Sequence, residues 1–390
     1  MRSQSLKLVL VVLVAATLVV GCGQGRDQTP SGERIVKIGS VAPLTGPQSH
    51  LGHDNDNGAR MAIDEANARH VKLGGEPVHF ELISEDDQAD PRTATIVAQK
   101  LVDAQVKGVI GHLNSGTSIP ASKIYADAGI PEISPSATAI KYTEQGFKTA
   151  FRTMTNDRQQ GRVLGEFAAT RMGKRVAIID DRTAYGQGLA DEVEKAVRAT
   201  GGEVVAREYT SDRSTDFSAI LTSIKGKTPD VLFYGGMDPQ GAPMVKQLRA
   251  LGLRARFLGG DGVQTTEFLK LAGQAGEGVT ASSPGLPIDS MPGGKEFRSQ
   301  FTAKYGPIQN YAPYAYDAVQ AMIMAMEKAG SAEPARYLPE LTRVQFTGIT
   351  GDIGFDDKGD VRGGAITLYR VTGGKWTVVD IVKSGVPAGR

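Results

Sequence analysis

Short apolar runs alternate with amphipathic stretches along this chain from residue 34 onward. Residues 35–41, 78–84 and 106–110 are apolar runs that predict strands, and a helix is predicted from about residue 57 to residue 68. The stretch after Asp90 and Pro91 instead repeats its apolar positions along one helical face, and these two residues favour a helix start, as cap and as first helical position. Because strands and helices alternate, we expect βαβ units and a parallel sheet.

The same alternation starts again near residues 152–157. Strands are predicted at residues 175–179, 203–209, 231–234 and 257–259, and helices at residues 185–199, 217–224 and 239–251. The chain has 390 residues, which at roughly 150 residues per domain corresponds to two or three domains. We therefore expect two similar α/β lobes.

A third stretch breaks the alternation. It contains two predicted helices without a strand between them, at residues 294–305 and 311–330, and a further helix near residues 335–342. The tail from residue 346 to residue 382 predicts β-hairpins with glycine-containing turns. The last part of the chain thus adds elements outside the two βαβ series.

The amino terminus has the features of an export signal. Arg2 and Lys7 precede an apolar run at residues 8–20, which is too short to span a bilayer. The run leads to Cys22 in a sequence that resembles a bacterial lipobox, so residues 1–22 are expected to be a lipoprotein signal peptide with lipid attachment at Cys22. Residues 23–33 are rich in Gly, Gln, Asp, Ser and Pro and predict a flexible tether. The alternative is an ordinary secretion signal with an incidental cysteine; in both cases we expect an exported, periplasmic protein, which the lipobox would tether to a membrane.

Composition excludes several classes of function. Hydrophobic residues make up 40% of the chain and charged residues 22%, and the net charge of +1 without blocks of like charge argues against nucleic acid as a partner. The single cysteine allows no internal disulfide. The five histidines lack zinc-ligand spacing, and no phosphate-binding loop, dinucleotide fingerprint or nucleophile elbow is complete. We therefore expect no metal, no cofactor and no catalysis.

Small hydroxyl residues follow two neighbouring predicted strands. Ser115 comes after the strand at residues 106–110, and Ser136 and Thr138 come after the strand at residues 129–133. The carboxyl ends of parallel strands are where open α/β folds bind ligands, and hydroxyl and backbone N–H groups at a helix start suit a carboxylate. The alternative is that these hydroxyls only cap helices. No acid, base or thiol accompanies them, so the loops predict binding.

Six segments carry a resemblance to a known family: residues 35–46, 57–63, 111–115, 133–138, 185–188 and 233–236. In this order they resemble the leucine/isoleucine/valine-binding proteins of bacterial ABC importers, which are type I periplasmic binding proteins. The resemblance implies two Rossmann-like lobes joined by a three-crossing hinge, with an amino acid held between them. It also implies delivery to a complex of ABC permease and ATPase by a protein that we expect to be a monomer.

The resemblance further implies where the lobes begin and end. The N-terminal lobe would comprise residues 34–156 and 285–367, and the C-terminal lobe residues 157–284 and 368–390. The stretch that breaks the alternation would then complete the first lobe.

The same resemblance implies the ligand contacts. The ligand carboxylate would bind Ser115, Ser136 and Thr138, and its ammonium group would bind Asp261. The pocket wall would consist of Tyr185, Leu51, Met237, Tyr311 and Asn114. Leu51 and Met237 stand where the family has aromatic residues, and Asp261 replaces a longer acid. These differences leave the ligand side chain open, with a branched-chain or similar aliphatic amino acid expected.

Two other functions remain open at this point. The same fold could bind an amide, a urea or an aromatic acid, in which case Asp261 would be dispensable. A lipoprotein that reports a ligand to a sensor would also fit the sequence.

Overall fold

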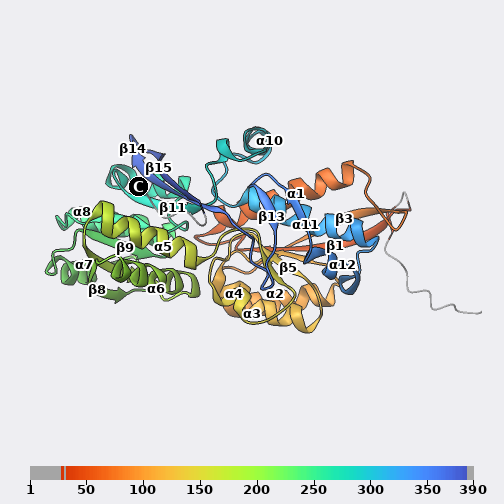
Figure 1. Cartoon of the computed structure of the whole chain (residues 1–390), viewed down its shortest axis with the longest axis horizontal. Coiled ribbons are helices and arrows are strands. Elements are labelled where there is room, and N and C mark those ends of the chain that lie inside the picture. Colours follow the sequence, from red (N-terminus) through yellow and green to blue (C-terminus); the bar gives the residue numbers. More distant parts are fainter. Residues whose placement is uncertain (1–27, 30–31, 384–390) are drawn as a thin grey trace, which may run out of the picture.

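The computed structural model describes residues 28–29 and 32–383, which form two lobes side by side along the long axis of the molecule (Figure 1). The first lobe contains a six-stranded sheet in the order β2-β3-β1-β4-β5-β6, parallel except for the β2–β3 pair. Its strands are β1 (Arg34–Ala42), β2 (Lys72–Leu73), β3 (Glu76–Asp86), β4 (Val109–Gly111), β5 (Glu132–Ser134) and β6 (Ala150–Arg152). The helices of this lobe are α1 (Ser49–Ala68), α2 (Pro91–Asp103), α3 (Ser115–Asp127), α4 (Lys141–Glu144), α10 (Gly294–Tyr305), α11 (Ala312–Ala329) and α12 (Pro334–Leu341).

Helices cover both faces of the first sheet. On one face, α1 and α11 share a core with Val36 and other inward residues of the strands. On the other face, α2 and α3 form a separate core with the strands, in which Leu101 of α2 lies with Val41 and Val109. The two helices α1 and α11 approach closely at Gly58, where an added Cβ would lie 2.2 Å from the carbonyl oxygen of Ala312. Only glycine allows this contact.

The second lobe contains a seven-stranded sheet in the order β15-β14-β11-β10-β9-β7-β8. Its strands are β7 (Arg175–Asp180), β8 (Glu203–Tyr209), β9 (Val231–Gly235), β10 (Arg256–Gly259), β11 (Thr280–Pro284), β14 (Ala365–Thr372) and β15 (Lys375–Lys383). The pairs β11–β14 and β14–β15 are antiparallel, and the others are parallel. The helical elements are α5 (Asp157–Phe167), the π-helix η1 (Ala168–Met172), α6 (Ala184–Ala199), α7 (Ser218–Lys225), α8 (Asp238–Ala250), α9 (Thr266–Ala272) and the 3₁₀ turn η2 (Gly273–Gly276). A further 3₁₀ turn, η3 (Ile288–Ser290), follows β11 and packs next to α10.

The side chains of the buried strand β7 point alternately to the two faces of the sheet, which explains why helices cover both faces. Val176 and Ile178 belong to the core that includes apolar residues of α5 and α6, whereas Ala177 and Ile179 belong to the core under α7 and α8. Successive side chains of a strand point to opposite faces, so a continuous apolar run requires a cover on each side.

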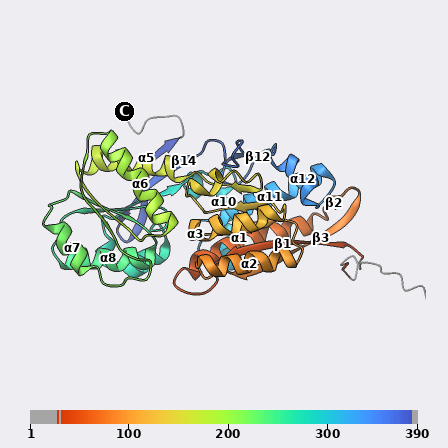
Figure 2. The same ribbon diagram turned by 90° about the horizontal axis from the view of Figure 1, so that it is seen from below.

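The chain passes between the two lobes three times. It leaves the first sheet after β6 and enters α5, returns after β11 to α10, and crosses again between the small hairpin of β12 (Gln345–Thr347) and β13 (Asp352–Gly354) and strand β14. Seen from below, α7 and α8 lie in one lobe and α11 and α12 in the other (Figure 2). The predicted fold class, two α/β lobes with a three-crossing hinge, is confirmed; the residue boundaries of the lobes stay a prediction.

One helix is longer than the sequence pattern indicates. The pattern predicts a start near residue 57, but α1 begins at Ser49. The additional turns bury polar residues, among them Asp54, Asn55 and Asp56. A search for apolar spacing misses a helix whose buried face is polar.

The predicted signal peptide, Cys22 and most of the predicted tether lie outside the described residues. Within residues 28–29 and 32–383, no helix is both long and apolar enough to cross a membrane.

Candidate ligand-binding site

The predicted site residues come together where the two lobes meet. Leu51 at the start of α1 and Tyr311 before α11 belong to the first lobe, and Tyr185 on α6 and Met237 before α8 belong to the second. All four side chains are buried in one hydrophobic cluster, together with Leu113 of the loop after β4. The contact between lobes is therefore apolar at the place where the sequence predicts the pocket wall.

Asp261 lies in the loop after β10 and is held from both lobes. Its Oδ1 accepts hydrogen bonds from the Tyr185 hydroxyl and from Nε2 of Gln160, each at 2.8 Å, and its Oδ2 accepts one from the Tyr311 hydroxyl at 2.8 Å. Gln160 is in turn fixed by Ser282, whose Oγ donates to Oε1 of Gln160 at 2.7 Å. The carboxyl group therefore has one fixed orientation.

The Asp261 carboxyl group is surrounded by neutral donors. The side chain is 1% exposed, and burial raises its pKa, while the hydrogen bonds from Tyr311 and Tyr185 lower it. No ion pair to Asp261 occurs within the described residues. A carboxylate offers about four acceptor positions, and three are used, so one position remains for a positively charged donor.

Two glycines make room for this acid. An added Cβ on Gly260 would lie 2.5 Å from the Tyr185 hydroxyl oxygen, and one on Gly262 would lie 2.6 Å from Sδ of Met237. Side chains at these positions would push Tyr185 and Met237 away from Asp261.

The hydroxyl groups of the first lobe differ in the hydrogen bonds that they already make within the protein. Oγ of Ser115 accepts a hydrogen bond from the Ala139 backbone N–H, which ties the start of α3 to the loop after β5. The Ser136 hydroxyl donates to the Leu113 carbonyl and accepts from Asn55, and its backbone N–H donates to Oγ of Ser134, so neither of its protons is free for a ligand carboxylate. Oγ1 of Thr138 is fully buried and has no hydrogen-bond partner in the described part of the chain.

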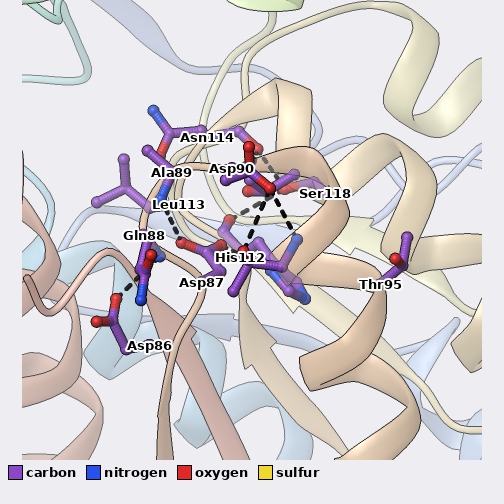
Figure 3. Close-up of polar contacts among 12 residues, drawn as sticks. Asp86, Asp87, Gln88, Ala89, Asp90, Thr95, His112, Leu113, Asn114 and Ser118 are labelled. Atoms are coloured by element: carbon purple, nitrogen blue, oxygen red, sulfur yellow. Dashed lines mark hydrogen bonds and ion pairs between the residues drawn. The ribbon is translucent and has the colours of Figure 1, made fainter.

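The loop that carries Ser115 is supported by a buried polar network (Figure 3). Nδ1 of His112 and Oδ2 of Asp87 are 2.8 Å apart, both side chains have 0% exposure, and the Asp87 backbone follows β3. The network ties the loop after β3 to the loop after β4. Asn114, at the end of the second loop, donates from Nδ2 to Gln48, and its buried Oδ1 is without a partner among the described residues.

Comparisons with known proteins decide the family. Residues 35–375 match the family described as periplasmic binding protein. This chain belongs to the periplasmic binding protein family. A leucine-, isoleucine-, valine-, threonine- and alanine-binding protein from Pseudomonas aeruginosa is 37% identical over 337 residues, which cover 86% of this chain and 89% of the relative.

Solved structures show the same architecture. A leucine-binding protein from Thermotoga maritima has a TM-score of 0.83 at 27% identity, covering 90% of this chain and 99% of that chain. A branched-chain amino acid transporter substrate-binding protein from Streptococcus pneumoniae, solved in complex with isoleucine, has a TM-score of 0.80 at 28% identity, covering 90% and 100%. The resemblance predicted from the sequence is confirmed.

In this periplasmic binding protein, the hydroxyl loop of the first lobe depends on Arg152 at the end of β6. The guanidinium has 0% exposure, and its Nη1 donates to the carbonyl oxygens of Ala137 and Ala139, at 2.7 and 3.0 Å. Its Nε pairs with Asp360. These bonds fix the backbone on both sides of Thr138.

Replacing Arg152 with lysine is expected to lower the free energy of unfolding by about 2 kcal/mol, because an ammonium group cannot serve Asp360 and both carbonyls at once. Urea denaturation measures this change. Arg158→Lys is the control, since that side chain is 58% exposed and pairs with Glu144; it is expected to change stability by less than about 0.5 kcal/mol. Equal effects of the two substitutions would contradict the assignment.

A second contact joins the lobes beside the candidate site. Nε2 of His50 on α1 lies 2.8 Å from Oδ2 of Asp238, the first residue of α8. Burial lowers the pKa of His50, but the hydrogen bond and charge of Asp238 more than offset this and raise it above its usual value. The charged pair therefore favours contact between the lobes below pH of about 6.5, and this contribution is lost as the pH rises through the raised pKa of His50.

His50→Gln is accordingly expected to weaken ligand binding about threefold at pH 6, in keeping with a single partly exposed pair. The effect should become smaller at pH 8.5, where the wild-type imidazole is neutral. Titration calorimetry at both pH values checks this; a loss of affinity that is the same at both would contradict the charge pairing.

Three residues at this site are absent from the sequence-based set: Gln160, Arg152 and Asp54. None of the three gives a signal in the sequence that places it near the hydroxyl loops or Asp261. An isolated charge in a sequence does not reveal that folding will bury it.

Proposed function

We propose that this protein is an extracytoplasmic binding protein that captures an aliphatic amino acid between its lobes and delivers it to an ABC importer. The names of its relatives support this, because the Pseudomonas protein is named for binding leucine, isoleucine, valine, threonine and alanine, and the Streptococcus structure contains isoleucine. The protein would act as a carrier and not as a catalyst.

The single observation that carries the proposal is Asp261. A buried carboxyl group that is oriented by three neutral donors, and that has an acceptor position left, needs a cation to complete it. The ammonium group of an amino acid provides that cation. Charge-assisted hydrogen bonds of this kind contribute roughly 1.5–3 kcal/mol each.

The opposite lobe would bind the carboxylate of the same ligand. The Ser115 hydroxyl still has its proton to donate, and Thr138 has a buried hydroxyl without a described partner. The ligand would then connect the acid of one lobe to the hydroxyl groups of the other, so that binding and closure of the lobes are one event. Leu51 and Met237, both aliphatic, would contact the ligand side chain.

The remaining parts of the proposal concern location and partners. The signal sequence and Cys22 support a periplasmic lipoprotein, and the family supports a location outside the cytoplasm. The partners would be an ABC permease and ATPase complex, the membrane through the lipid anchor, and no nucleic acid. We expect the carrier to be a monomer.

Isothermal titration of the purified protein against leucine, isoleucine, valine, threonine and alanine tests the proposal. We expect micromolar or tighter binding of at least one, which corresponds to about −8 kcal/mol. Benzoate, acetamide and urea are the comparison ligands. Binding of one of these, together with no heat from any amino acid, would overturn the proposal.

A further inference from the structure

Asp157 is a buried acid that the interactions described so far do not use. It is the first residue of α5, where the chain enters the second lobe, and its side chain has 0% exposure. Neither carboxyl oxygen makes a hydrogen bond of ordinary geometry within the described residues, and the neighbouring donor that favours its ionised form is the hydroxyl of Thr138. Buried carboxyl groups are normally paired or hydrogen-bonded, so this one requires an explanation.

The position of Asp157 relates it to both halves of the candidate site. Its backbone N–H donates to the carbonyl oxygen of Thr138, at 2.8 Å, in the hydroxyl loop of the first lobe. Gln160, one helical turn further along α5, holds Asp261. On the other side, Oδ2 of Asp157 lies 3.5 Å from the place that a Cβ on Gly188 of α6 would occupy.

This position means that the lobes cover Asp157 together. Thr138 belongs to the first lobe and Gly188 to the second, so separation of the lobes would expose the carboxyl group to water. With the lobes together, burial raises the pKa of Asp157 to about 8; the Thr138 hydroxyl lowers it and the nearby Asp261 raises it.

Charged groups approach Asp157 from each element packed around it, and none neutralises it. Arg152 of β6 lowers its pKa, but this guanidinium is bound to Asp360 and to two carbonyl oxygens, and Glu192 of α6 raises the pKa. The adjoining groove between α4 and α6 is lined by further charged side chains, which are Lys141, Glu144, Arg158, Asp191 and Lys195. Several of these have partners of their own, since Glu144 pairs with Arg158 and Asp191 with Arg207.

We propose that Asp157 opposes closure of the empty cleft and that the positive charge of a ligand's ammonium group, held by Asp261, offsets the negative charge of Asp157. Closure of the empty cleft would bury an ionised carboxylate that has only the Thr138 hydroxyl beside it and no cation, which is unfavourable, or would require uptake of a proton. A ligand with an ammonium group brings its own positive charge. The closed conformation would then form with a bound amino acid and not in its absence. A carboxylic acid that lacks the amino group would bind more weakly. This inference rests on the proposed amino-acid function.

Small-angle X-ray scattering of the ligand-free protein tests the first half of the inference. For the wild type, the radius of gyration should fall as the pH is lowered from 8.5 to 5.5, because closure becomes more favourable by up to about tenfold per pH unit below the raised pKa. Asp157→Asn should be compact already at pH 8.5. His50 also favours contact at low pH, but it is present in both proteins, so the difference between their curves reports Asp157.

A matched control is available in the same groove. Asp191→Asn removes one negative charge that is already paired with Arg207, and it should behave as the wild type does. Identical ligand-free scattering of wild type and Asp157→Asn would overturn the inference. Should Asp157→Asn fail to fold, a wild-type radius that does not change between pH 8.5 and pH 5.5 would overturn it equally.

Titration with leucine and its deaminated analogue, 4-methylpentanoate, tests the second half. The analogue should bind Asp157→Asn at least tenfold more tightly than it binds the wild type, and unchanged analogue affinity would contradict the role of the ammonium group. The outcomes also separate the two proposals. If no amino acid binds the wild type, the proposed function is wrong; if leucine binds but Asp157→Asn changes neither scattering nor discrimination, only this inference is wrong.

Discussion

Asp261→Asn is expected to weaken binding of leucine or a similar amino acid more than a hundredfold. The asparagine amide has nearly the same shape and can still accept from Tyr185 and Gln160, so the pocket should keep its form. The substitution removes the negative charge that would face the ligand ammonium group. Loss of one buried, charge-assisted contact amounts to about 3 kcal/mol, which is roughly a hundredfold or more in affinity.

Titration calorimetry with two ligands separates loss of charge from loss of structure. Leucine should lose affinity for Asp261→Asn, whereas 4-methylpentanoate, which has no ammonium group, should not. Glu267→Gln serves as a control because its side chain lies at the surface of the same lobe, where it pairs with Lys270. Wild-type affinity of Asp261→Asn for leucine would exclude the assigned role of Asp261 and would favour the amide, urea or aromatic-acid alternatives.

Asp54→Ala is expected to lower the free energy of unfolding by about 4 kcal/mol. Asp54 is 3% exposed on α1, and its carboxylate accepts from four backbone N–H groups at the start of α11, those of Gln309, Asn310, Tyr311 and Ala312. The first N–H groups of a helix have no partner within the helix, so the substitution would leave several of them buried and unsatisfied.

The same substitution should also reduce ligand affinity, because Asp54 positions the backbone of Tyr311, and the hydroxyl of Tyr311 holds Asp261. Urea denaturation measures the stability and calorimetry the affinity. Asp64→Ala, on the exposed side of the same helix and paired with Lys304, should change stability by less than about 0.5 kcal/mol. A loss of similar size in the control would show that the cap of α11 is not the cause.

Most elements of the fold could be predicted because their buried faces are apolar. The strand at Glu203–Tyr209 and the helix at Gly294–Tyr305 have the predicted bounds, and Asp90 caps α2 as expected by accepting from the N–H groups of Arg92 and Thr93. The first turns of α1 were missed for the opposite reason. Their inward face carries Asp54 and Asn55, and a polar residue is buried only where distant parts of the chain supply its partners.

The candidate site could be predicted in part. The hydroxyl loops follow strand ends, whereas Asp261 and the pocket wall came from the resemblance to a family. Whether the Ser136 side chain is free to meet a ligand could not be predicted, because Asn55 and the Leu113 carbonyl, which occupy it, come from other parts of the chain.

The order of apolar runs and amphipathic stretches by itself determined the two α/β lobes, since burial of an apolar face depends mainly on the residues of each element. The pairing of charges was decided only by the tertiary structure. Asp261 accepts hydrogen bonds from Tyr185, Gln160 and Tyr311, and Arg152 forms an ion pair with Asp360. Asp157 forms no ion pair within the described residues. These outcomes depend on which segments the fold brings within a few ångströms, and hydrogen bonds and ion pairs act only over such distances.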